Sequence, residues 1–100
     1  MRVELLYFED CPNYRPAVDR LRAVLRDEGV HADVTEVRAN DASTAQRLQF
    51  IGSPTIRING LDIEADVRAL RAGALACRRY SGGLPSEAMI REALKEALEK

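Results

Sequence analysis

Short apolar runs alternate along the chain with longer segments in which apolar residues recur every three or four positions. The run from Val3 to Phe8 is rich in Val, Leu, Tyr and Phe, which predicts a strand buried on both faces. After Pro12 the apolar positions fall on one side of a helix, and Gly29 is suited to end it because glycine adopts the left-handed conformation. These apolar positions are Ala17, Val18, Leu21, Val24 and Leu25. A helix that begins at Pro12 would need the N–H that Pro16 lacks, so we expect an irregular first turn.

A second strand and a short helix come next. Residues Val30 to Arg38 mix valines with charged side chains, which predicts a short strand at the edge of a sheet. Asp41 or Ser43 can cap a following helix, because their side-chain oxygens accept hydrogen bonds from backbone N–H groups. We expect this helix to be short and to end at Gly52.

The next segment predicts a β-hairpin. Ser53 to Ile58 resumes the strand pattern, and Asn59-Gly60 is a preferred two-residue turn into a further strand, Leu61 to Ile63. Residues 65 to 83 show helical spacing only in part, and we expect a partly helical loop there.

The C-terminal segment predicts an amphipathic helix that Ser86 caps. Its apolar face consists of Ile90, Ala93, Leu94, Ala97 and Leu98. The predicted order is therefore β-α-β-α-β-β-α, an α/β fold. Because the first β-α-β unit implies parallel strands and the hairpin antiparallel ones, we expect a mixed sheet flanked by helices.

Composition narrows the class of protein. One hundred residues with 46% hydrophobic content fit a single domain that spans residues 1–100. The formal net charge of −1 gives no overall attraction to nucleic acid or to an anionic membrane. No cationic leader with an apolar core opens the sequence, and no apolar run can span a bilayer, so we expect a cytoplasmic protein. Two cysteines, Cys11 and Cys77, do not make a disulfide scaffold or a zinc site, and we expect no cofactor and no resident metal.

Cys11 stands where the first strand pattern stops and the first helix pattern begins. Since Pro12 suits a first helical position, Cys11 is predicted to be the N-cap, with its sulfur facing unpaired backbone N–H groups. Such groups favour the thiolate, which is the reactive and metal-binding form, whereas Glu9 and Asp10 act against it. We expect Cys11 to be at least partly exposed and to be alkylated before Cys77.

Two segments, Phe8-Glu9-Asp10-Cys11-Pro12-Asn13-Tyr14 and Phe50-Ile51-Gly52-Ser53-Pro54-Thr55-Ile56, give the sequence a family resemblance. With the order of elements, they resemble the thioredoxin and glutaredoxin superfamily, and within it a small bacterial branch with some members labelled as related to alkylmercury lyases. The resemblance covers nearly the whole chain and implies a thioredoxin-like fold, thiol-disulfide oxidoreductase chemistry at Cys11 and a cis Ser53–Pro54 bond beside it. It further implies that a thiol or disulfide substrate contacts Pro12, Tyr14, Ser53, Pro54 and Thr55.

The superfamily's redox motif is Cys-x-x-Cys, and here Tyr14 occupies the position of the second cysteine. Tyrosine cannot release a mixed disulfide by attack, so three interpretations stay open. In the first, Cys11 acts alone and glutathione or another small thiol resolves its mixed disulfides. In the second, residues 65 to 83 bring Cys77 close enough to act as the resolving thiol. In the third, the fold is a non-enzymatic module that binds a protein partner or a soft metal ion such as mercury.

The sequence allows two roles for Tyr14 and indicates one for His31. Tyr14 either donates its hydroxyl toward the sulfur or covers the first helical turn as an amphipathic aromatic residue. His31 lies far from Cys11 in the pattern, which indicates a surface histidine. No Ser-His-Asp arrangement and no phosphate-binding glycine loop is found, so the candidate chemistry rests on cysteine.

Overall fold

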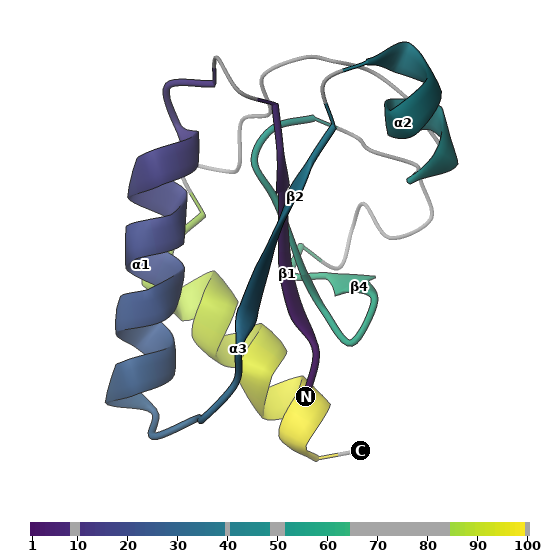
Figure 1. The fold of residues 1–100 in the computed structure, drawn as a ribbon. Coiled ribbons are helices and arrows are strands. Elements are labelled where there is room, and N and C mark those ends of the chain that lie inside the picture. Colours follow the sequence, from purple (N-terminus) through teal and green to yellow (C-terminus); the bar gives the residue numbers. More distant parts are fainter. Residues whose placement is uncertain (9–10, 40, 49–51, 65–84, 100) are drawn as a thin grey trace.

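The computed structural model describes residues 1–8, 11–39, 41–48, 52–64 and 85–99. Within these residues, four strands form a single sheet that packs against helices (Figure 1). In chain order, the described elements are β1 (Val3–Tyr7), α1 (Tyr14–Asp27), β2 (Val34–Arg38), α2 (Ala42–Arg47), β3 (Thr55–Ile58), β4 (Leu61–Asp62) and α3 (Glu87–Leu98). The predicted loop at residues 65 to 83 lies outside the described part of the chain.

The sheet is mixed, with the strand order β2-β1-β3-β4. β1 runs parallel to β2 and antiparallel to β3, so that Val3 lies opposite both Val34 and Ile58. Between β3 and β4, Asn59 has φ +53° and Gly60 has φ +84°, the two positive values that a type I′ hairpin turn requires. The predicted mixed sheet, the edge position of β2 and the Asn-Gly hairpin are therefore confirmed.

Helices cover both faces of the sheet. Successive side chains of β1 point in opposite directions, so β1 contributes apolar residues to both faces. Val3 and Leu5 belong to a buried cluster with residues of α1 and α3, whereas Leu6 packs on the other face with Ala39 and with Ala45 of α2. Figure 1 shows the same division, with α1 and α3 on one side of the strands and α2 on the other. The prediction that the first strand is buried on both faces is confirmed.

Two prolines determine where α1 begins. The helix starts at Tyr14 with Asn13 as its N-cap, and the Ala17 N–H donates to the Asn13 carbonyl over 3.2 Å. Pro16 thus falls in the first turn, where backbone N–H groups have no partner within the helix and a missing one costs nothing. The predicted start at Pro12 was wrong because it would have placed Pro16 where the helical ladder needs a donor. Cys11 is therefore not the N-cap.

The C-terminus of α1 confirms the predicted role of Gly29, which has φ +66°. Its N–H donates to the Arg26 carbonyl over 3.1 Å, and the Val30 N–H donates to the Leu25 carbonyl over 2.9 Å. These two bonds form a Schellman motif, and Val30 packs on the core beside it. Because Val30 is used in closing the helix, β2 begins only at Val34 and not at residue 30 as the pattern predicts.

Of the two candidate caps for α2, the structure uses Asp41. Its side chain accepts a hydrogen bond of 2.7 Å from the Thr44 N–H, which also lowers the pKa of the Asp41 carboxyl below its usual value. The helix ends at Arg47, so the predicted end at Gly52 was wrong. Gly52 has φ +134°, far from the left-handed helical region near +57°, and it precedes the turn into β3 instead of closing a helix.

The predicted cap of α3 is confirmed, since the Ser86 hydroxyl oxygen accepts a hydrogen bond of 3.1 Å from the Met89 N–H. Ile90, Ala93 and Leu94 are buried as the pattern predicts. Leu98 was wrongly assigned to the buried face, because it occupies the last helical position and is 63% exposed.

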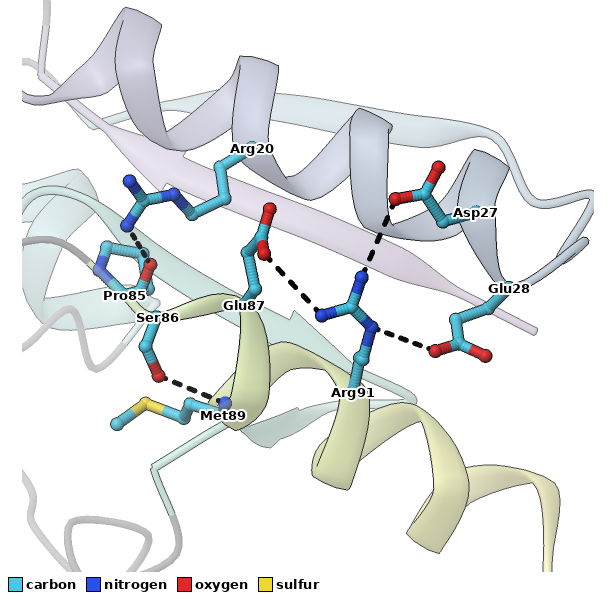
Figure 2. A network of polar contacts seen from close by, with 8 residues as sticks. All are labelled: Arg20, Asp27, Glu28, Pro85, Ser86, Glu87, Met89 and Arg91. Atoms are coloured by element: carbon cyan, nitrogen blue, oxygen red, sulfur yellow. Dashed lines mark hydrogen bonds and ion pairs between the residues drawn. The ribbon is translucent and has the colours of Figure 1, made fainter.

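Arg91 links α3 to the end of α1 (Figure 2). Its guanidinium lies 2.9 Å from Glu28, 3.5 Å from Asp27 and 3.5 Å from Glu87. Asp27, the last residue of α1, and its C-cap Glu28 are thereby turned toward α3 (Figure 2). At the other end of the same contact, Arg20 donates to the Pro85 carbonyl over 2.9 Å. These polar contacts fix α3 alongside α1 over the buried cluster.

Candidate thiol site

Cys11 lies in the connection between β1 and α1, with its backbone held on both sides. Its N–H donates to the Phe8 carbonyl over 3.1 Å, and its carbonyl accepts from the Tyr14 N–H over 3.3 Å. The side chain is only 6% exposed, so the expectation of a partly exposed thiol was wrong. Because the helix begins at Tyr14, the side chain of Cys11 is turned into the protein and not over the first helical turn.

The sulfur of Cys11 donates a hydrogen bond to the carbonyl of Ser53 over 3.5 Å. Ser53 is fully buried, and its own hydroxyl oxygen accepts from the Phe8 N–H over 3.3 Å. Two contacts thus join the end of β1 and Cys11 to the segment before β3. The partner of the sulfur is an acceptor, so this contact uses the thiol proton and differs from the N–H-stabilised thiolate that the sequence predicts.

The segment from Ser53 to Thr55 has its side chains inside the protein. Ser53 and Thr55 are fully buried, and the Thr55 hydroxyl donates to the Gly52 carbonyl over 2.5 Å. The Ser53–Pro54 bond is cis, the isomer that the resemblance implies. Among the other residues expected to contact a substrate, Pro12 is exposed. Pro12 is therefore open to a molecule bound beside Cys11, whereas Ser53, Pro54 and Thr55 are buried and are not exposed for the substrate contact that the resemblance implies.

Tyr14 faces the strands and not the thiol. Its ring stacks on the ring of Tyr7 with centroids 3.8 Å apart, and its hydroxyl donates to the carboxylate of Glu36 on β2. The guanidinium of Arg15 lies 5.0 Å from the centre of the same ring. Of the two roles left open, the hydroxyl directed at the sulfur was wrong, because the hydroxyl is bonded to Glu36 and the ring packs on Tyr7 of β1.

The contact with Glu36 shifts the titration of both partners. The hydrogen bond that Tyr14 donates to the Glu36 carboxylate stabilises the neutral phenol, and it raises the pKa of Tyr14 above its usual value. The same bond, together with Arg22 at 3.1 Å, lowers the pKa of Glu36. At neutral pH, the pair is therefore a neutral phenol bonded to a carboxylate.

Sequence reasoning missed Tyr7 and Glu36 as neighbours of Tyr14. One signal was present, since Glu36 is a charged residue in the middle of a strand predicted to lie parallel to the first. Its pairing with Tyr14 depends on the register of β1 and β2, in which Leu5 lies opposite Glu36. No local pattern specifies that register.

Cys11 is a free cysteine, and Cys77 lies outside the described residues, so its predicted proximity to Cys11 stays a prediction. Among the residues that the structure describes, no group of three or more His, Cys, Asp or Glu side chains is arranged to hold a metal ion. None of the described helices is long and apolar enough to cross a membrane.

Comparisons of the chain with protein-family models, with curated proteins and with solved structures find no match. The site consists of a buried thiol, a backbone carbonyl that accepts a hydrogen bond from it, and a stacked pair of tyrosines, one at the end of β1 and one at the start of α1.

Proposed function

We propose that the protein is a thioredoxin-like monothiol that exchanges disulfides through Cys11. The observation that carries the proposal is the 3.5 Å contact between the Cys11 sulfur and the Ser53 carbonyl. It brings the Cys-Pro and Ser-Pro-Thr segments, which are far apart in the sequence, into one site. The mixed sheet with helices on both faces and the cis bond before Pro54 are compatible with a thioredoxin-like fold.

In the proposed reaction, the Cys11 thiol first loses its proton to solvent and leaves the Ser53 carbonyl. The thiolate attacks the glutathione sulfur of a mixed disulfide between glutathione and a protein thiol. The new Cys11–glutathione bond forms as the old sulfur–sulfur bond breaks, and the protein thiolate leaves. A second glutathione thiolate then attacks the bound glutathione sulfur, which yields oxidised glutathione and restores the Cys11 thiolate.

The neighbours of Cys11 have distinct tasks in this cycle. Once the thiol proton has left, the Ser53 carbonyl can accept an N–H from the peptide-like backbone of the substrate, provided that the buried segment around Ser53 opens as well. Tyr14 cannot resolve the mixed disulfide, and its hydroxyl is already bonded to Glu36. The resolving thiol therefore comes from outside, or from Cys77 in the second interpretation. Because Cys11 is 6% exposed, reaction requires the thiol to become more accessible than it is in this structure.

The burial of Cys11 favours a second candidate, a binding module without turnover. A thiol that is buried and already hydrogen-bonded behaves as a small packed side chain. In this candidate the fold serves to bind a protein partner or, through its thiolates, a soft metal ion such as mercury. The two candidates differ in whether a mixed disulfide at Cys11 forms and is then released.

The decisive experiment is turnover of a glutathionylated peptide in the presence of reduced glutathione and glutathione reductase, followed by NADPH oxidation. We expect the natural protein and Cys77→Ser to turn over, and Cys11→Ser to be inactive but folded. Activity in Cys11→Ser would reject the proposal. If both Cys11→Ser and Cys77→Ser are inactive, the two-cysteine interpretation holds. If Cys11 is alkylated but no turnover occurs, the binding module is the better description.

A further inference from the structure

A surface hollow lies between the end of α1 and the start of β2, at the opposite end of α1 from Cys11. Figure 1 shows this end where α1 turns into the connection to β2. The hollow has a volume of about 530 Å³, within the range of small-molecule sites. Leu25, Val30 and Val34 form an apolar wall, and Arg22, Arg26 and His31 contribute polar groups to the same lining. An apolar surface thus adjoins a cationic one.

The charges at the end of α1 are separated between its two sides. Asp27 and Glu28 are paired with Arg91 on α3, as Figure 2 shows, and so do not neutralise the arginines of the hollow. Arg22 and Arg26 are one helical turn apart, an arrangement of like charges that disfavours the helix. Arg22 is compensated by Glu36 at 3.1 Å. Arg26 has no ion-pair partner among the residues that the structure describes, so its guanidinium, unlike that of Arg22, is not engaged by a carboxylate. Asp33 in the same lining balances the charge of Arg26 formally without forming an ion pair with it.

We propose that this hollow binds a small amphipathic carboxylate, with the carboxylate on Arg26 and the apolar body on Leu25, Val30 and Val34. The planar guanidinium of arginine matches a carboxylate with two parallel N–H donors. His31 provides a further ring N–H at the edge of the hollow.

The same lining argues for a single negative charge on the ligand. Asp33 also borders the hollow and opposes a second negative charge there. With Arg22 already engaged by Glu36, Arg26 is the arginine of this lining whose guanidinium can bind a single carboxylate. An apolar wall next to that cation selects against a small, fully hydrated anion such as phosphate, because phosphate has no surface to bury there.

The test is a titration of the ¹⁵N-labelled full chain followed by NMR, with octanoate, octylammonium and inorganic phosphate as probes. We expect octanoate to shift the amide signals of residues 29–34, and octylammonium and phosphate to bind at least about tenfold more weakly. Arg26→Gln should weaken octanoate binding about tenfold, the loss of one charge-assisted contact. Arg47→Gln makes the same change of charge on the exposed surface of α2 and should leave the affinity unchanged.

Several outcomes would overturn the proposal. Equal affinity for octanoate and octylammonium would indicate a purely apolar surface, and equal affinity for phosphate would indicate a simple cationic patch. Octanoate shifts that lie away from residues 29–34, or an unchanged affinity in a folded Arg26→Gln variant, would remove the site itself. None of these measurements involves Cys11, so the result is independent of the proposed thiol chemistry.

Discussion

The ring of Tyr14 lies flat on the ring of Tyr7, with the centroids 3.8 Å apart and the planes 4° apart. Since Tyr7 is the last residue of β1 and Tyr14 the first of α1, the stack closes the connection that contains Cys11. The Tyr14 hydroxyl adds a bond to Glu36 on β2. Strand, helix and neighbouring strand are thus joined at one side chain, next to the thiol.

Tyr14→Phe keeps the stacked ring and removes only the hydroxyl. At neutral pH we expect the free energy of unfolding to fall by about 0.5 kcal/mol, less than for a buried hydrogen bond because solvent reaches the pair. Urea unfolding of both proteins measures the difference. An unchanged midpoint would show that solvent replaces the Glu36 bond at no cost.

The stabilisation from this pair should depend on pH in a defined way. The raised pKa of Tyr14 means that the contribution is full below the usual phenol value of 10.0 and declines as the pH rises toward the folded value. The lowered pKa of Glu36 means that the contribution of the pair to stability is full above the usual carboxyl value of 4.5 and is lost as the pH falls through the folded value. The difference between the natural protein and Tyr14→Phe should therefore be largest between these limits. A difference that is constant from acid to alkaline pH would contradict the assignment.

Arg91→Ala removes the cation that three carboxylates share. We expect a loss of about 1 kcal/mol in the free energy of unfolding at low salt, because Asp27, Glu28 and Glu87 are left without their partner. High salt should reduce the loss, since these side chains are partly exposed and screened. Lys95→Ala, on the same helix and exposed, is the matched control and should change little. Equal effects at low and high salt would argue for lost packing and not for lost charge.

Ser53→Ala leaves the Phe8 N–H without the hydroxyl that accepts from it. We expect a loss of about 1 kcal/mol in stability and faster alkylation of Cys11, because the segment beside the thiol opens more often. The alkylation rate is measured with a thiol reagent under native conditions, in a Cys77→Ser background in which Cys11 is the thiol that can react. Ser43→Ala, which removes an exposed hydroxyl on α2, should leave the rate unchanged. Slower or unchanged labelling in Ser53→Ala would mean that this contact does not limit access.

Ile90→Ala and Leu98→Ala compare two apolar positions of α3. Ile90 is fully buried and Leu98 is 63% exposed. We expect about 2 to 5 kcal/mol for Ile90→Ala, from lost burial and the cavity left behind, and under about 0.5 kcal/mol for Leu98→Ala. Urea unfolding with a two-state fit gives both values. A large effect at Leu98 would reveal a contact of this side chain that the described residues do not account for.

The parts of the fold that could be predicted are those set by neighbouring residues in the sequence. The hairpin turn at Asn59-Gly60, the cap of α3 at Ser86 and the end of α1 at Gly29 all depend on contacts between residues a few positions apart. Each can therefore be predicted from a short stretch of sequence. Apolar spacing likewise gave the buried faces of α1 and most of α3.

The site was harder to predict because it depends on the residue at which α1 begins and on the register between β1 and β2. The position of Cys11 follows from where α1 begins relative to Pro12 and Pro16, and a shift of the N-cap by two residues, from Cys11 to Asn13, turned an expected exposed cap into a buried thiol. The partner of Tyr14 follows from the alignment of β1 with β2. Such choices are made by the packed structure as a whole, and no short window contains them.

The central position of β1 has a consequence for how the chain is completed during synthesis. Val3 leaves the ribosome before Val34 and well before Ile58, its two neighbours in the sheet. Until then, the apolar side chains of Leu5 and Leu6 have no sheet to be buried in. Because pairing between distant segments is slow, β1 stays without its partners until β2 and β3 have been made, and its apolar side chains need protection during that time. We expect this strand to be where a chaperone first binds the unfinished protein.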